Sequence, residues 1–143
     1  MREDYLISIK GTMLPAGETE KDTVELVTRG GFVRRNGKFF ISYAETEATG
    51  YQGNVTTVRV EDGHKVSMLR HGSAPSQLII ERGKRHVCHY DTSHGSLSLG
   101  VAADEIDNRL TEHGGEITFS YTLDSGQEHL SHNQVKITVQ EAD

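Results

Sequence analysis

The chain is poor in the features that mark disulfide frameworks, membrane spans and secreted precursors. It holds one cysteine, two prolines and no tryptophan in 143 residues. The single cysteine, Cys88, excludes a disulfide within the chain and suits a reducing compartment. No run approaches the ~20 consecutive apolar residues of a spanning helix, and the first residues, MREDYLISIKGTM, lack the apolar core of a signal peptide. The sequence therefore predicts a cytoplasmic protein without a membrane partner.

Positive charge is also scarce. The chain has 15 Lys and Arg residues against 21 Asp and Glu residues, a net charge of −6 at pH 7. A nucleic-acid binder normally shows a basic face that neutralises phosphates. The densest local group of basic residues, Arg34, Arg35 and Lys38, flanks a turn, and a solvated hairpin tip accounts for it. We therefore predict no nucleic-acid partner.

Glycine and short alternating runs are what the chain has in quantity. Six of its 15 glycines fall in the turn signals AGE (16–18), NG (36–37), DG (62–63), RG (82–83), SHG (93–95) and DSG (124–126), and the runs between these signals are rich in Val, Ile, Thr, Phe and Tyr. We expect strands near 4–13, 18–29, 31–35, 38–45, 54–61, 64–71, 76–82, 85–92, 96–110, 116–123 and 129–140. No linker or repeat interrupts them. The sequence predicts one all-β domain over residues 1–143, a closed antiparallel meander barrel of the lipocalin or calycin type.

The hairpin over residues 55–70 can be given a register from its apolar residues. A three-residue EDG loop pairs Val58 with Val66 and places all the apolar side chains on one face. It requires Gly63 in the left-handed conformation. It also places Arg70 on the same face as Val66, at the far end of the strand.

The next hairpin, over residues 76–92, favours a three-residue loop as well. This loop aligns Leu78 with Cys88 and sets Glu81 opposite Arg85 as a favourable charge pair.

Histidine is concentrated in RHVCHYDTSHG, residues 85–95. In a strand, His86 and Cys88 share the core face about 7 Å apart while His89 points the other way, so these ligands do not converge on one metal ion. An inward Cys88 beside apolar neighbours is a packing residue rather than a nucleophile. We interpret the stretch as a strand and predict no metal, no cofactor and no catalytic residue there.

The segment 101–114 is ambiguous. Ile106 and Leu110 are four residues apart, as in a short helix, yet strand alternation with a bulge near Asp104 fits equally well. We favour one long bent strand, since such strands are common where a sheet closes.

Polar residues are predicted to gather at one end of the barrel. Alternate strands of a meander run in the same direction, so three expected strands finish together, and their last core-side residues are Tyr43, Glu45, Arg70, Tyr90 and Thr92. An inward Arg70 needs partners, because an unpaired buried charge is costly. Glu45 is the expected ion-pair partner and Tyr90 a hydrogen-bond partner. Two interpretations stay open: the pair closes the barrel structurally, or the group orients a small polar or anionic ligand.

Four stretches resemble the YwiB-like family of uncharacterised bacterial proteins: ISYAE (41–45), TTVRV…KVSMLRHG (56–72), HYDTSHGSLSL (89–99) and FSYTL (119–123). Their most specific elements are Arg70-x-Gly72 and Tyr90-x-Thr92-x-x-Gly95. The resemblance covers nearly the whole chain and implies a small cytoplasmic β-barrel similar to lipocalins and other calycins. It implies no activity. The histidine enrichment is particular to this chain, which argues against a shared role for the histidines.

Three functions remain in competition. The first is a lipocalin-like barrel that binds a small molecule around Arg70. The second is a barrel filled by side chains that acts as an interaction or assembly protein, and the third is an enzyme that uses Glu45 or Tyr90. Cavity volume separates the first two, because small barrels are often filled. The sequence leaves homo-oligomer formation open.

Overall fold

Ten strands form the barrel. The computed structural model describes residues 4–92 and 95–142, without the side chains of residues 48, 91 and 92. The elements are β1 Tyr5–Pro15, β2 Asp22–Arg35, β3 Lys38–Ala44, the 3₁₀ turn η1 Glu47–Thr49, β4 Val55–Glu61, β5 Lys65–His71, β6 Ser76–Glu81, β7 Arg85–Thr92, β8 Gly95–Thr111, β9 Gly114–Asp124 and β10 His129–Glu141. Each strand is antiparallel to the next, and β1 pairs with β10 to close the barrel. The predicted all-β closed meander is confirmed. In this described part of the chain, no helix is long and apolar enough to cross a membrane.

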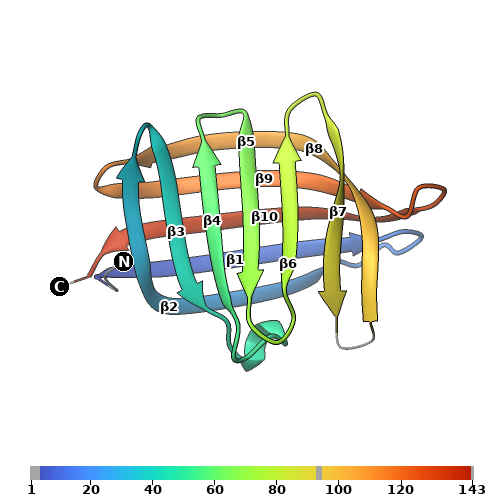
Figure 1. The fold of residues 1–143 in the computed structure, drawn as a ribbon, viewed down its shortest axis with the longest axis horizontal. Helices are drawn as coiled ribbons and strands as arrows, with labels where there is room; N and C mark the ends of the chain where they lie inside the picture. Colours follow the sequence, from blue (N-terminus) through green and yellow to red (C-terminus); the bar gives the residue numbers. More distant parts are fainter. Residues whose placement is uncertain (1–3, 93–94, 143) are drawn as a thin grey trace.

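The barrel is flattened into two layers (Figure 1). Strands β3 to β7 form the front layer, and β1, β9 and β10 run across them behind. The long strands β2 and β8 bend and take part in both layers. Gly30 lies at the bend of β2, where it pairs with both Tyr5 and Tyr43, and a Cβ there would collide with the Ser42 carbonyl and the Ile7 side chain. Only glycine permits this approach.

The predicted strand boundary at Gly30 is wrong. Two strands were expected, at 18–29 and 31–35, with residue 30 between them. The structure has one strand, β2, because the glycines bend the chain without turning it. In β8 the expected long bent strand is confirmed: its register shifts between Ala103 and Glu105, where a bulge was predicted near Asp104.

The β4–β5 register differs from the expected one by two residues. Val60 pairs with Val66 and Glu61 with Lys65, so the predicted pairing of Val58 with Val66 is wrong. A shift of two preserves which face each side chain occupies, because side chains alternate with period two. The expected left-handed Gly63 is also wrong: Asp62 takes that conformation, with φ of 55°, which aspartate tolerates better than most residues.

The seam between β6 and β7 is loosely joined. Ser76 pairs with Tyr90, in the predicted register, and no other position of the two strands is paired in the described chain. Further along the seam the backbone N–H of Ile79 donates to Cys88 Sγ at 3.4 Å. A side-chain sulfur thus takes the place of a backbone acceptor.

The charge pair expected across this seam is wrong. Arg85 instead binds Asp124, with Nη2 to Oδ1 at 2.6 Å. Glu81 accepts a contact from His86, with Nε2 to Oε1 at 2.9 Å. Arg85 and Glu81 are thus each paired with a different residue.

Pairing across the front layer aligns inward side chains in rows. The upper row, nearest the β2–β3, β4–β5 and β6–β7 turns, is Phe39, Val60, Val66 and Ile80. The lower row, at the opposite end, is Tyr43, Thr56, Arg70, Ser76 and Tyr90. The same strands and the same alternation produce both rows, yet the upper row is apolar and the lower row is polar.

Candidate functional site

The lower row lies inside the barrel. Tyr43, Thr56 and Arg70 are 5%, 4% and 7% exposed, although all three carry polar groups. Burial, and then the neighbouring charge of Glu45, raise the pKa of Tyr43 far above its usual value, so its phenol stays protonated. The predicted convergence of Tyr43, Arg70 and Tyr90 at one end of the barrel is what the strand pairing produces.

Arg70 is held by a carbonyl and two aromatic rings. Its Nε donates to the Ala74 carbonyl at 2.5 Å, and its Nη1 donates to the Tyr90 hydroxyl at 3.3 Å. Its guanidinium carbon lies 3.5 Å from the centre of the Tyr51 ring and 4.9 Å from that of Tyr90. Such stacking stabilises a cation away from water. Arg70 is therefore fixed in position and oriented by its neighbours.

The expected ion pair between Glu45 and Arg70 is wrong. Among the described residues no ion pair joins them, and Glu45 Oε1 instead accepts a hydrogen bond from Thr56 Oγ1 at 2.6 Å. Thr56 is itself the cross-strand partner of Arg70, so it stands between the two charges. Among the described residues, the buried Glu45 Oε2 has no hydrogen-bond partner, although the Glu45 carboxylate also interacts with the Tyr43 hydroxyl. A buried acceptor in that state is destabilising, and it is the kind of exception that calls for an explanation.

Tyr51 completes the site and was not anticipated from the sequence. It follows η1, in the loop between β3 and β4, and its hydroxyl lies 3.3 Å from the hydroxyl of Tyr90. Burial, and then this hydrogen bond to Tyr90, raise the pKa of Tyr51. An aromatic residue between Gly50 and Gly53, in the loop that follows a strand ending at the site, is the signal that could have revealed it.

Asn54 ties this loop to the next one. Its Nδ2 donates to the Tyr51 carbonyl at 2.9 Å, and its Oδ1 accepts from the Ala74 amide at 3.0 Å. Gly72 has φ of 135°, and a Cβ there would collide with Asn54. The Arg70-x-Gly72 motif thus has a physical basis: the arginine enters the barrel, and the glycine leaves room for the asparagine that positions Tyr51.

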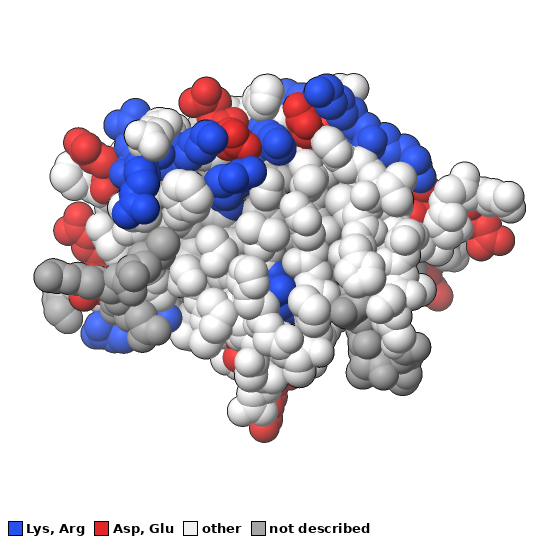
Figure 2. Space-filling model, viewed as in Figure 1, with Lys and Arg blue, Asp and Glu red and all other residues white. Residues whose placement is uncertain are grey.

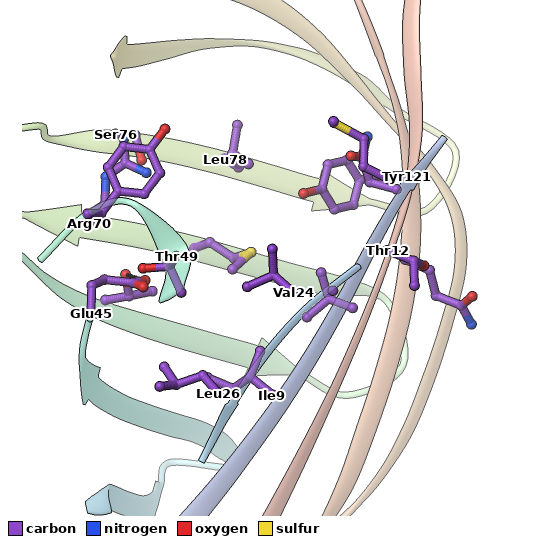
Figure 3. A pocket seen from close by; sticks show the side chains of 18 of the residues that line it. Ile9, Thr12, Val24, Leu26, Glu45, Thr49, Arg70, Ser76, Leu78 and Tyr121 are labelled. Carbon is purple, nitrogen blue, oxygen red and sulfur yellow. Dashed lines mark hydrogen bonds between the residues drawn. The ribbon is translucent and has the colours of Figure 1, made fainter. Parts of the chain in front are cut away.

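A cavity of about 420 Å³ adjoins these groups, so side chains do not fill the barrel. Figure 3 shows Glu45, Arg70 and Ser76 on one side of it, and Val24 and Leu26 further along. Apolar surface dominates the rest of the wall, which includes Ile9, Met68, Leu78 and Val135. The cavity is amphipathic, with a polar end and an apolar body.

The histidine-rich stretch forms strand β7 over its described part, as expected. His86 contacts Glu81, His89 is exposed, and burial raises the pKa of the Cys88 thiol. No group of three or more His, Cys, Asp and Glu side chains able to hold a metal ion occurs within residues 4–92 and 95–142. The side chain of Thr92, a predicted site residue, lies outside the described atoms, as does His94. The absence of metal binding stays a prediction.

Comparison with known proteins agrees with this fold. A family model described as a domain of unknown function (DUF1934) matches residues 7–137. The chain is 27% identical over 135 residues to the uncharacterised beta-barrel protein YwiB of Bacillus subtilis, covering 93% of this chain and 92% of that protein. The crystal structure of the ywiB protein from Bacillus subtilis superimposes with a TM-score of 0.80 at 23% identity, over 97% of this chain and 92% of the other. At that identity the superposition shows the shared fold alone.

Proposed function

This chain belongs to the family of the domain of unknown function DUF1934, and we propose that it binds a small amphipathic molecule inside its barrel. The polar end of the ligand lies against Glu45, Arg70 and Tyr90, and its apolar body lies beside Met68 and Leu78. The observation that carries the proposal is a buried carboxylate oxygen, Glu45 Oε2, that has no hydrogen-bond partner among the described residues, in a residue that lines a cavity of about 420 Å³. Known ligand cavities span about 300–1,000 Å³ and combine apolar walls with a few polar groups.

The wall chemistry specifies the polar end of the ligand. Glu45 Oε2 needs a hydrogen-bond donor, which a hydroxyl, amide or ammonium group supplies. Arg70 adds a positive charge that favours an anionic or electron-rich group nearby. A ligand with both a donor and an acceptor at one end satisfies both residues.

This function is that of a lipocalin-like binder, and we place it in the cytoplasm because Cys88 suits a reducing compartment. The cavity favours binding over a purely structural barrel, whose interior side chains would fill that space.

Native mass spectrometry of protein purified from its own host tests the proposal. We expect a fraction of the protein to carry one small molecule that is released when the protein is acid-denatured. Protein that carries no small molecule after gentle purification would contradict the proposal.

A variant that removes the charge of Glu45 sharpens the test. Glu45→Gln replaces one carboxylate oxygen by an NH₂ group, which opposes a ligand donor, and we expect the retained fraction to fall by about tenfold. Glu128→Gln makes the same chemical change at an exposed turn and should retain the ligand like the wild type. Equal retention in both variants would show that Glu45 does not contact the ligand.

A further inference from the structure

The three hairpin turns β2–β3, β4–β5 and β6–β7 lie on one edge of the front layer. Successive hairpins of a meander alternate between the two ends of the strands, so every second turn shares an edge. In Figure 1 these turns are uppermost, opposite the end that holds the lower row. We call residues 34–38, 59–65 and 81–85 the basic edge.

Charge is strongly segregated onto this edge. It holds eight of the 15 Lys and Arg residues and three of the 21 Asp and Glu residues, so its formal charge is +5 while the rest of the chain carries −11. Figure 2 shows Lys and Arg side chains following that edge, with few acidic ones between them. Taken alone, the group of Arg34, Arg35 and Lys38 is a solvated hairpin tip. The fold brings three such tips together.

Glu61 and Glu81 of the edge each contact more than one cation, so they position the cations without neutralising all of them. Glu61 lies 3.3 Å from Lys38, 3.7 Å from Arg59 and 3.8 Å from Lys65. Burial alone would raise the pKa of Glu61, but the hydrogen bond from Lys38 and the nearby positive charges outweigh it and lower the pKa. One ionised carboxylate is thus shared by three cations.

Glu81 has the same arrangement at the next turn. It contacts His86 at 2.9 Å and Lys84 at 3.6 Å, and the hydrogen bond from His86 lowers its pKa. Across the edge, Arg34, Arg35 and Lys84 face solvent, while Arg85 is paired with Asp124, which lies outside the edge.

We infer that the basic edge docks an extended, acidic segment of a partner protein. Strands lie about 4.8 Å apart, so the first and last of these turns, four strand spacings apart, are separated by about 20 Å, the length of about six extended residues. A linear row of fixed cations matches alternating carboxylates along such a segment. This surface is at the far end of the barrel from the cavity and is independent of it.

A polypeptide fits this edge better than a nucleic acid. Single-stranded nucleic acids bind where exposed aromatic side chains stack on bases, and the basic edge contains no Phe, Tyr or Trp. The charge of −11 on the rest of the chain also repels a long polyanion that extends beyond the edge.

Fluorescence anisotropy with a labelled peptide of about ten glutamates, at about 0.15 M salt, tests the inference. Arg35→Glu combined with Lys84→Glu changes two exposed tips of the edge, and we expect affinity to fall by about tenfold or more. Lys10→Glu combined with Lys136→Glu is the matched control, because it makes the same change in net charge on a neighbouring pair of the back layer. The control should bind within about threefold of the wild type.

Either of two outcomes with the peptide would overturn the inference: no binding by the wild type, or equal weakening by both double variants, which would show that only net charge matters. A labelled oligothymidine of equal charge that binds as tightly as the peptide would also overturn it, because the edge would then not select carboxylates over phosphates.

Discussion

The upper and lower rows of the front layer both point into the barrel, but the upper row is apolar and the lower row is polar. Phe39, Val60, Val66 and Ile80 are 7%, 0%, 0% and 0% exposed, and Tyr43, Thr56 and Arg70 of the lower row are 5%, 4% and 7% exposed. Tyr43, Thr56 and Arg70 are thus as buried as the upper row, whereas Ser76 and Tyr90 of the lower row are half-buried. Apolar side chains in the lower row would avoid the cost of desolvating polar groups. The polar composition of the lower row therefore indicates a role beyond stability.

The polar row is only partly satisfied within the protein. Arg70 is well supplied with partners, and this part of the row could be explained by structure alone. Within the part of the chain that the structure describes, Glu45 Oε2 has no hydrogen-bond partner. A purely structural network would be expected to close on itself, so the unpaired oxygen beside a cavity is where the comparison favours binding.

The largest change in the free energy of unfolding is expected from a substitution in the upper row. Ile80→Ala should lower the free energy of unfolding by about 2–5 kcal/mol, because Ile80 is fully buried and its loss leaves a void. Chemical denaturation measures this, and ligand retention should be unchanged at a temperature where the variant is folded. If Ile80→Ala abolished retention in the folded state, the two rows would not be separate in function.

Arg70→Met should have a smaller effect on stability and a larger one on binding. It leaves the Ala74 carbonyl without its donor, so we expect a loss of about 1–3 kcal/mol in unfolding free energy. Retention of the small molecule should be abolished. Arg59→Met, on the outer side of β4, is the control. A variant that is less stable but still retains the ligand would assign Arg70 a structural role only.

Glu45→Gln should leave stability within about 1 kcal/mol of the wild type, or raise it, because it removes a buried charge whose second oxygen is unpaired. Urea unfolding of the ligand-free protein measures the change. A loss of several kcal/mol would reveal a structural role for Glu45 and weaken the contrast between the rows.

The smallest effect on stability is expected at an ion pair on the surface, Arg85 with Asp124, outside both rows. Hydrogen bonds from Arg85, and then from the Gly126 amide, lower the pKa of Asp124 from 3.8 to about 2. Since this pKa is depressed on folding, the pair contributes stability above about pH 3.8 and loses it as the pH falls through about 2. In Arg85→Ala, NMR titration should find the Asp124 pKa raised toward its ordinary value, with the Gly126 amide still lowering it in part. An unchanged pKa would contradict the assigned cause.

Alternation and turn signals were sufficient to predict the closed meander, because face and direction follow from parity. They placed Tyr43, Arg70 and Tyr90 on one inner end even though the β4–β5 register was wrong by two residues. A shift of two moves a residue along the strand without changing its face.

Partner choice could not be predicted in the same way. The predicted ion pair between Glu45 and Arg70 is wrong because Thr56, which has a short side chain and lies between them, binds the carboxylate instead. Tyr51 belongs to a loop whose path depends on Asn54 and Gly72. Such contacts depend on distances within about 1 Å, which strand periodicity does not specify.

The most direct test of the cavity as the binding site compares two tryptophan variants by native mass spectrometry of protein purified from its own host. Leu78 lines the cavity and is 6% exposed, and Val87 lies on the outer face of the neighbouring strand and is 69% exposed. Leu78→Trp should fill the cavity and carry no small molecule, whereas Val87→Trp and the wild type should carry it. Thermal unfolding confirms that both variants are folded. A folded Leu78→Trp variant that retains the molecule as fully as Val87→Trp would contradict binding inside the barrel.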